Sequence, residues 1–474
     1  MRIDTLIINA DTLTMAGEGV GYVDNAAIVI DSGKIVAVVP MSEAAGFEAE
    51  ETIDATRKLV LPGFIDGHMH AGLALFRGLA QDTRDWMMRG QKPYSSRMEK
   101  EYCLPASHMN MLEALAAGTT TFGEYSFPDQ IREQAAFLDK LGARANLTIT
   151  IRGTTRQITG KDINDLYEFD DDMARHALAE NLKLYDEWHG KNGRFTVCLG
   201  PQGPDFLSRE MLITCKKEAT ERNMMLHVHL AQGKRETIQM MKRYNMRSIP
   251  FMDELGYLDN KLIAAHITDA TTEEAQMLAK RGAAMVLCSG SIGIIDGEVP
   301  PAWEFMKAGG YAALGTDQAS GNNCNQIINE MKLTALFNKI KYMDPEVMPA
   351  WRALRMATID GARALGLSDR IGSLEPGKQA DIIFINLRAK TMMPVVKHPV
   401  RNYVPNLVYS ARGSEVVRVM VAGRTLYQDG KYLTVDEGQL IEELETASSE
   451  YFARFPLEAV KDTVGYELLC SDRL

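Results

Sequence analysis

Apolar residues between about positions 63 and 377 fall into short runs that alternate with longer amphipathic segments. The segments carry apolar positions at helical spacing, as in Thr272 to Arg281, and the runs are bounded by residues typical of turns. Apolar strands that alternate with helices are typical of a parallel sheet buried on both faces. Eight such runs predict a closed (β/α)8 barrel of the TIM-like type at residues 63–377. The runs are residues 59–70, 119–125, 145–153, 195–203, 224–232, 262–267, 283–291 and 312–317.

The two ends of the chain carry short β-branched runs without intervening helices. We therefore expect a small β-sandwich domain formed from both chain ends, with residues 1–62 and 378–436 as its two parts. A helical tail at 437–474 follows. The runs are residues 5–15, 27–30, 34–39, 381–387, 416–423 and 425–432, and the turn at 31–33 predicts a hairpin.

Composition and charge narrow the range of partners. The net charge of -11 argues against nucleic acid or an anionic membrane, because phosphate binding needs basic patches. No apolar run reaches transmembrane length, and the alternating start MRIDTLIINADTLTM predicts a strand rather than a signal peptide. The six cysteines are widely spaced without a CxxC pair, as expected for reduced thiols. We expect a cytoplasmic protein that binds a small molecule, and neither nucleic acid nor a membrane.

Histidines gather at the ends of the predicted barrel strands, where barrel enzymes place their chemistry. Two imidazoles two residues apart on a strand share one face and can bind the same ion. A lone histidine on an apolar strand is usually structural, but five at strand ends with an aspartate predict a metal site. The residues are His68, His70, His227, His229, His266 and Asp317.

Four motifs carry a resemblance to a known family. LPGFIDGHMH (61–70), HVHLAQ (227–232), AAHxTxxxxE (264–273) and LGTDxxxxNN (314–323) resemble the amidohydrolase superfamily, in its branch of triazine hydrolases and purine-type deaminases. The chain is also similar to phenylurea and molinate hydrolases. The resemblance extends from about residue 5 to about residue 430 and includes IGSLEPGKQADIIFI (371–385). In these enzymes that segment leads from the barrel back into the small β-domain.

The resemblance implies one divalent metal ion per chain, bound by three histidines and one aspartate. Zinc is the default ion for this donor set, although iron, cobalt or manganese can occupy such sites. His266 would contact the attacking water or the substrate, and Asp317 would also accept the proton of that water. The fourth run lacks the lysine that bridges two metals in binuclear relatives, so a single ion is expected. The implied ligands are His68, His70, His229 and Asp317.

Three positions depart from the pattern of purine deaminases. Gln232 occupies the position of a glutamate that follows the ligand histidine by three residues, and glutamine cannot serve as a general acid. Gln202 replaces a frequent histidine, and the sequence at 288–291 replaces a turn that contains proline. Glu124, at the end of the second run, is a candidate acid or a hydrogen-bond partner of a metal ligand. The predicted substrate contacts are Gln202, Phe76, Trp86 and Asn322.

These departures favour hydrolysis of a non-peptide C–N bond of the amide, urea or carbamate type in a small nitrogen-containing molecule. Asp317, His266, Gln232 and Glu124 would be the catalytic residues. The second hypothesis is an aminohydrolase (deaminase) of a triazine, pyrimidine or pterin ring. A non-catalytic metal-binding barrel is the third, but a structural site needs neither an open coordination position nor a base. The resemblance and the apolar residues near Tyr451 also predict a homo-oligomer.

Overall fold

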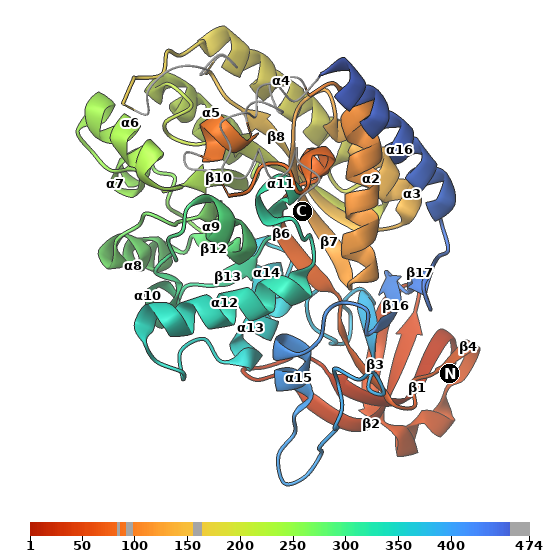
Figure 1. The fold of residues 1–474 in the computed structure, drawn as a ribbon. Helices are drawn as coiled ribbons and strands as arrows, with labels where there is room; N and C mark the ends of the chain where they lie inside the picture. Colours follow the sequence, from red (N-terminus) through yellow and green to blue (C-terminus); the bar gives the residue numbers. More distant parts are fainter. Residues whose placement is uncertain (83–85, 92–97, 155–163, 456–474) are drawn as a thin grey trace, which may run out of the picture.

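The structure is a computed structural model that describes residues 1–82, 86–91, 98–154 and 164–455. A parallel barrel surrounded by helices packs beside a second sheet, in which strands from both chain ends lie together (Figure 1). This arrangement confirms the predicted fold class. None of the helices among the described residues is both long enough and apolar enough to span a bilayer.

The barrel sheet runs in the order β13-β12-β11-β10-β9-β8-β7-β6-β14. β13 pairs with β12, and β14 pairs with β6. Only Gly315 and Thr316 separate β13 from β14, so they are two halves of one eighth strand, which closes the barrel. The strands are β6 (Phe64–His70), β7 (Thr119–Ser126), β8 (Arg144–Ile151), β9 (Phe195–Pro201), β10 (Leu226–Leu230), β11 (Leu262–His266), β12 (Ala284–Leu287), β13 (Ala312–Leu314) and β14 (Asp317–Gln318).

Besides the run at 312–317, which is divided between β13 and β14, two of the predicted runs do not form single strands. The run at 59–70 is divided between β5 (Lys58–Pro62) and β6, and β5 belongs to the other sheet. Gly63 lies between them, where an added Cβ would lie 2.2 Å from the Thr120 side chain. The run at 283–291 stops as a strand at Leu287, because α9 (Ser289–Ile295) begins within it.

The surrounding helices bury one face each against the barrel. α8 (Thr272–Arg281) matches its predicted bounds and begins with a capping box. The Thr271 hydroxyl accepts from the Glu274 N–H (3.2 Å), and the Glu274 carboxylate accepts from the Thr271 N–H (2.8 Å). The others are α2 (Lys100–Ala116), α3 (Ile131–Leu141), α4 (Asp171–Trp188), α5 (Arg209–Glu221), α6 (Lys234–Tyr244), α7 (Ser248–Glu254), α10 (Ala302–Lys307), α12 (Ile327–Tyr342), α13 (Ala350–Met356) and α14 (Ile359–Ala364).

The second sheet joins the chain ends in the order β18-β17-β16-β15-β5-β1-β2-β3, with β4 also paired to β1. β15 runs antiparallel to β5, so that Ile383 lies opposite Leu61. Ile7, Ile28 and Phe384 are fully buried in the core on this sheet. The strands besides β5 are β1 (Arg2–Leu13), β2 (Tyr22–Asp31), β3 (Lys34–Pro40), β4 (Glu48–Asp54), β15 (Ile382–Asn386), β16 (Val416–Val421), β17 (Arg424–Gln428) and β18 (Lys431–Tyr432).

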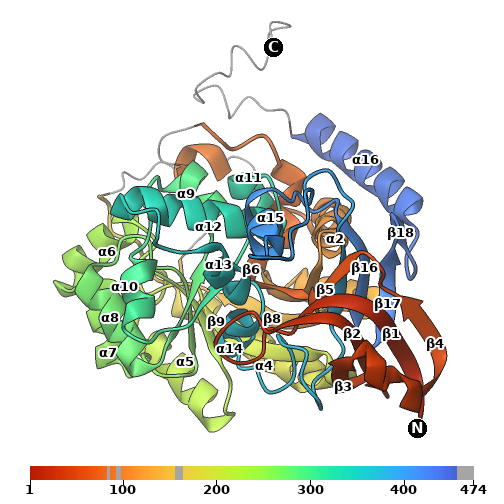
Figure 2. The same ribbon diagram turned by 90° about the horizontal axis from the view of Figure 1, so that it is seen from below.

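The last described helix, α16 (Glu437–Arg454), lies along α2 in both views (Figures 1 and 2). The ring centroid of Tyr451 lies 5.5 Å from that of Phe76 and 5.6 Å from that of Tyr102. The apolar face near Tyr451 is therefore covered within the chain, so it no longer argues for a homo-oligomer, which stays a prediction. Residues 456–474 of the predicted tail, including Cys470, lie outside the described residues.

Candidate active site

The predicted metal ligands meet at the mouth of the barrel, where β6, β10, β11 and β14 end. One candidate ligand atom from each of His68, His70 and His229 lies within 4.8 Å of the others. The same limit holds for the group of His68, His266 and Asp317. The structure therefore brings together all four predicted ligands, with His266 beside them.

Backbone carbonyls hold two of these imidazoles in one orientation. Nδ1 of His70 lies 2.5 Å from the Tyr125 carbonyl oxygen, and Nδ1 of His229 lies 3.0 Å from that of Gln202. Because each Nδ1 donates a proton there, each Nε2 keeps its lone pair. The two Nε2 atoms are 3.3 Å apart, and Asp317 Oδ1 lies 3.5 Å from Nε2 of His70. Facing lone pairs beside a carboxylate fit a bound cation.

Two further histidines have buried nitrogens without a hydrogen-bond partner. His68 uses Nδ1 toward Nε2 of His227 at 2.9 Å, and its own Nε2 has no partner. Neither ring nitrogen of His266 has one. Unpaired buried polar atoms are costly, and their convergence beside Asp317 is explained by a metal ion and its water. The donor set therefore fits one divalent ion of the zinc type.

Burial keeps these imidazoles neutral. Desolvation lowers the pKa of His227 to about 3 and that of His266 to about 4. The pKa values of His68 and His229 are also well below the usual range, for the same reason and because the other imidazoles lie close. Neutral imidazole is the form that binds metal ions, so the site is ready for one at physiological pH.

The backbone of two site residues is left-handed. His266 has a φ of 75° and Asp317 has a φ of 58°, a conformation uncommon for residues other than glycine. At Asp317 this turn separates β14 from β13, and the Ser291 hydroxyl donates a hydrogen bond to Oδ2 of Asp317. Such outliers concentrate at functional sites, where the surrounding structure maintains them.

Glu124 lies behind the metal ligands. Each of its carboxylate oxygens lies 3.2 Å from the Ala71 N–H, directly after His70 in the chain. Burial raises the pKa of Glu124 to about 8. This contact matches the alternative in which Glu124 supports a metal-ligand segment, and its role as a catalytic acid stays a prediction.

The two glutamines that depart from the deaminase pattern differ in their surroundings. The side-chain Oε1 of Gln202 is buried without a partner, so it can accept a hydrogen bond from a ligand. The half-buried Gln232 donates its backbone N–H to Glu236 at 2.8 Å. Glu236 also accepts the Ala231 N–H, so its carboxylate fixes the turn between β10 and α6 and does not replace the missing glutamate.

Two of the other three predicted substrate contacts already have partners within the chain. Phe76 is fully buried against Tyr451 and lies in the packing of α16. The Asn322 amide donates to the Thr316 carbonyl (2.8 Å) and to Glu330 (3.0 Å). Trp86 is buried with no partner for Nε1, so it alone of these three offers an unused donor. Contact with a substrate stays a prediction for all three residues.

Two supporting residues, Asp66 and Tyr125, were not assigned a role from the sequence, and His227 was counted only among the histidines at strand ends. His227 holds His68, and Asp66 accepts the His68 N–H (3.2 Å) and the Thr316 hydroxyl (2.5 Å). The Tyr125 ring lies 4.8 Å from that of His229, and its hydroxyl donates to the Gly200 carbonyl (2.8 Å). A buried aspartate and a second HxH pair within apolar strands were the available signals.

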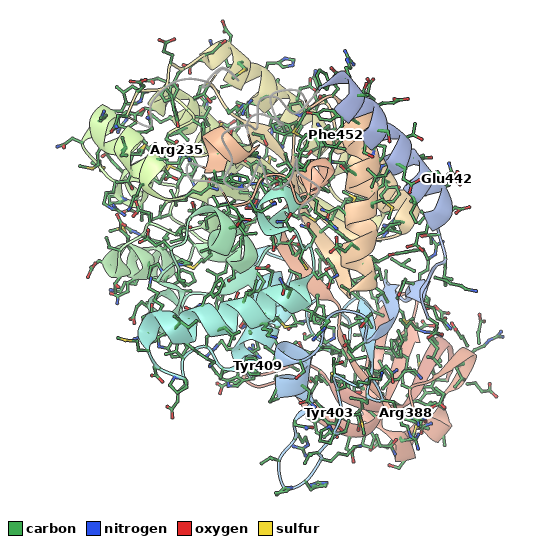
Figure 3. The ribbon with its side chains drawn as sticks, in the orientation of Figure 1. Arg235, Arg388, Tyr403, Tyr409, Glu442 and Phe452 are labelled. Atoms are coloured by element: carbon green, nitrogen blue, oxygen red, sulfur yellow. The ribbon has the colours of Figure 1, made fainter. Side chains whose placement is uncertain are left out.

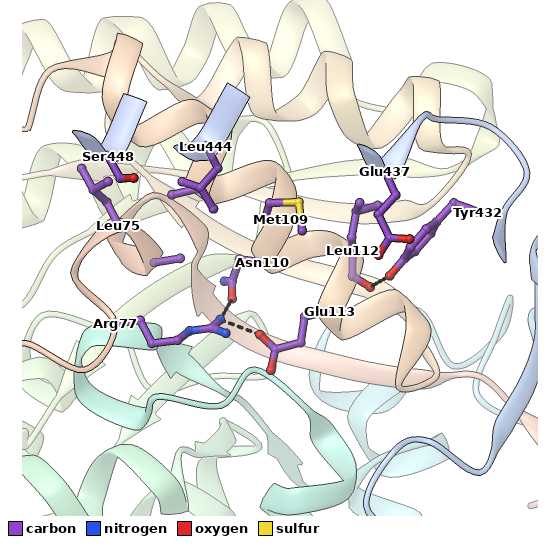
Figure 4. A pocket seen from close by; sticks show the side chains of 12 residues that line it. Leu75, Arg77, Met109, Asn110, Leu112, Glu113, Tyr432, Glu437, Leu444 and Ser448 are labelled. Carbon is purple, nitrogen blue, oxygen red and sulfur yellow. Dashed lines mark hydrogen bonds and ion pairs between the residues drawn. The ribbon is translucent and has the colours of Figure 1, made fainter. Parts of the chain in front are cut away.

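A hollow of about 480 Å³ lies between α2, α16 and the short 3-10 helix η2 (Ala71–Phe76). Arg77 extends across it toward Asn110 and Glu113 (Figure 4). Tyr432 closes one end by donating its hydroxyl to the Leu112 carbonyl (2.8 Å). None of the clustered histidines lines this hollow, which is therefore distinct from the metal site.

Comparisons with known proteins agree with this geometry. A model described as the amidohydrolase family matches residues 59–426. A 5-methylthioadenosine/S-adenosylhomocysteine deaminase of Moorella thermoacetica is 34% identical over 399 residues, which are 84% of this chain and 88% of that protein. A 5'-deoxyadenosine deaminase of Methanosarcina barkeri is 30% identical over 463 residues, which are 95% of this chain and 99% of that protein.

A solved structure extends the match to the whole fold. An adenosine deaminase from Xanthomonas campestris with bound zinc superposes with a TM-score of 0.86 at 26% identity. The superposition covers 95% of this chain and 99% of that one. With the histidine and aspartate cluster in place at the barrel mouth, the chain belongs to the amidohydrolase family.

Proposed function

We propose that the protein is a zinc-dependent aminohydrolase that removes an exocyclic amino group from a nitrogen heterocycle, with adenine nucleosides as the first substrate class. The observation that carries this proposal is the convergence of His68, His70, His229 and Asp317 with the unpartnered ring of His266. The similar proteins named above are deaminases of adenosine-type nucleosides. They favour the aminohydrolase hypothesis over the amide, urea or carbamate hydrolysis that the sequence favoured.

Each residue has a defined task in this reaction. When bound, a divalent ion polarises water and lowers its pKa toward 7, to about that value in zinc enzymes. Asp317 accepts a proton from the attacking water, and His266, with both nitrogens unengaged, donates a hydrogen bond to the developing charge. Gln202 Oε1 accepts a hydrogen bond from the exocyclic amino group of the substrate.

Hydrolysis of an amide, urea or carbamate is the second candidate, and Gln232 is the residue that favours it. Purine deaminases use a glutamate at this position as a proton carrier, as the resemblance implies, and a glutamine cannot titrate. Under this hypothesis the products would be a free amine and an acid rather than ammonia and a ring carbonyl.

The two candidates differ in their products, so one panel separates them. Zinc-loaded protein is incubated with adenosine, 5'-deoxyadenosine, 5-methylthioadenosine and S-adenosylhomocysteine, and in parallel with a phenylurea and a carbamate. Ammonia release and the change in ring absorbance are recorded, with Asp317→Asn as the inactive control. We expect ammonia from at least one nucleoside. Turnover of the urea or carbamate alone would overturn the proposal, and bound metal without any turnover would favour the non-catalytic barrel.

A further inference from the structure

The barrel mouth contains a carboxyl group to which the mechanism above assigns no task. Asp296 follows α9, the helix that begins after strand β12. It is half-buried, and the helix that it follows carries Ser291, the hydrogen-bond donor to Asp317. The segment 288–291, which departs from the purine deaminase pattern, ends five residues before Asp296.

The Asp296 carboxyl group lies against the backbone of Gly233. Its Oδ1 is 3.4 Å from the position that a Cβ on Gly233 would occupy. Gly233 directly follows Gln232 and has a φ of 95°. The chain there has no side chain and a left-handed backbone. The segment after α9 thus brings a carboxyl group beside the residue that follows Gln232.

Among the described residues, the Asp296 side chain has no hydrogen bond and no ion pair. Arg235, which extends from the first turn of α6 (Figure 3), is the cation that acts on it, but Arg235 is already paired with the buried Asp205. Burial and the negative charges of Asp317 and Glu298 raise the pKa of Asp296 to about 7, so a proton is available near neutral pH.

We propose that Asp296 is the general acid that replaces the glutamate missing at Gln232. The proposal rests on the aminohydrolase function. The water oxygen bonds to the ring carbon that carries the amino group, the electron pair of the ring C=N bond moves to the ring nitrogen, and one water proton passes to Asp317. Asp296 gives its proton to the amino nitrogen as the exocyclic C–N bond breaks. Ammonia leaves with the bonding electron pair, and the pair on the ring nitrogen re-forms the ring C=N bond. The proton on Asp317 then returns through solvent to the Asp296 carboxylate, and Gln232 orients the substrate through its amide.

A leaving group that needs no proton separates acid catalysis from a structural role. Adenosine and 6-chloropurine riboside differ at the leaving group, and chloride departs unprotonated. We expect Asp296→Asn to lower kcat on adenosine by about 100-fold, within the usual range for a general acid. Turnover of the chloro substrate and zinc content should be unchanged. Glu221→Gln, which changes an exposed carboxylate at the end of α5, is the matched control and should leave both reactions intact.

A double variant tests whether a carboxyl group at position 232 can replace the one at Asp296. Gln232→Glu in the Asp296→Asn background should restore adenosine turnover by at least about tenfold, because a carboxyl group returns to the family's position. Equal losses on both substrates, or no rescue, would show that Asp296 is structural. Full activity of Asp296→Asn on adenosine would also overturn the inference. Wild-type protein that releases neither ammonia nor chloride would overturn the aminohydrolase function itself.

Discussion

Arg144 and Asp381 form a bidentate ion pair that is almost completely buried, with N–O distances of 2.7 and 3.0 Å. Arg144 begins barrel strand β8, and Asp381 directly precedes β15 of the second sheet. Asp381 also accepts the Ala422 N–H at 2.8 Å, and Arg144 donates to the Gly193 carbonyl at 2.9 Å. The pair thus joins the two sheets, and each of the two side chains has a further hydrogen-bond partner.

Removal of one partner should destabilise the protein strongly. Arg144→Met leaves the Asp381 carboxylate buried without its cation, and we expect the free energy of unfolding to fall by about 3–5 kcal/mol. Urea denaturation followed by circular dichroism measures this loss. Arg175→Met breaks the exposed pair with Asp172 and should leave the midpoint unchanged. Equal midpoints for Arg144→Met and wild type would contradict the prediction.

The metal site should hold one divalent ion per chain. We expect His229→Ala to lose most of that ion, because it removes an imidazole that faces Nε2 of His70 at 3.3 Å. Elemental analysis of dialysed protein measures the content. His176→Ala, which removes an exposed histidine on α4, is the control and should keep the ion. Two ions per chain in active wild-type protein would refute the mononuclear site.

The hydroxyl that supports Asp317 should affect turnover more than metal content. Ser291→Ala removes the hydrogen bond to Oδ2 and lets the carboxylate rotate. We expect kcat to fall by about 10-fold to 100-fold, with zinc retained. Asp317→Asn should be far worse, since it changes the proposed ligand and the proposed proton acceptor together. Steady-state kinetics beside zinc analysis checks both, and a Ser291→Ala enzyme with unchanged kcat would count against this support.

Glu330 predicts a pH dependence of stability. Its carboxyl group is fully buried and accepts the Gly290 N–H at 3.0 Å, and burial raises its pKa to about 8. The folded state therefore holds this proton more tightly, and the resulting stabilisation is lost as the pH rises from about 4.5 toward 8. Glu330→Gln keeps a neutral acceptor and loses that dependence.

We therefore expect the free energy of unfolding of Glu330→Gln to increase, relative to wild type, by up to about 1.4 kcal/mol per pH unit between pH 5 and 8. Denaturant titrations at several pH values measure it. Glu221→Gln, at an exposed site on α5, serves as the control. Parallel stability curves for wild type and Glu330→Gln would contradict the prediction.

The barrel and the gathering of histidines and an aspartate at its mouth could be predicted because their signals are local. Apolar runs identify strands buried on both faces, and the polar residues that end those runs meet at one edge of a parallel sheet. The division of the run at 59–70 was missed, although Pro62 and Gly63 mark a turn. An apolar pattern alone does not distinguish two consecutive strands that belong to different sheets.

The supporting groups were harder to predict, because their roles depend on contacts between distant segments. Asp296 lies beside Gly233 only because the loops after β10 and β12 meet at the barrel mouth. Phe76 follows the HxH motif closely, yet it packs on Tyr451 near the other end of the chain. Sequence spacing contains no information about either pairing.

The pairing of β5 with β15 also constrains how the chain can fold during synthesis. The β15 edge of β5 stays open until residues 382–386 have left the ribosome, long after β5 itself has emerged. The barrel strands lie between these two segments in the chain. The barrel can therefore close while one edge of β5 is still unpaired. Exposed strand edges promote aggregation, and contacts so distant in sequence form slowly. Expression yield should therefore depend on chaperones during the interval before the last strands are made.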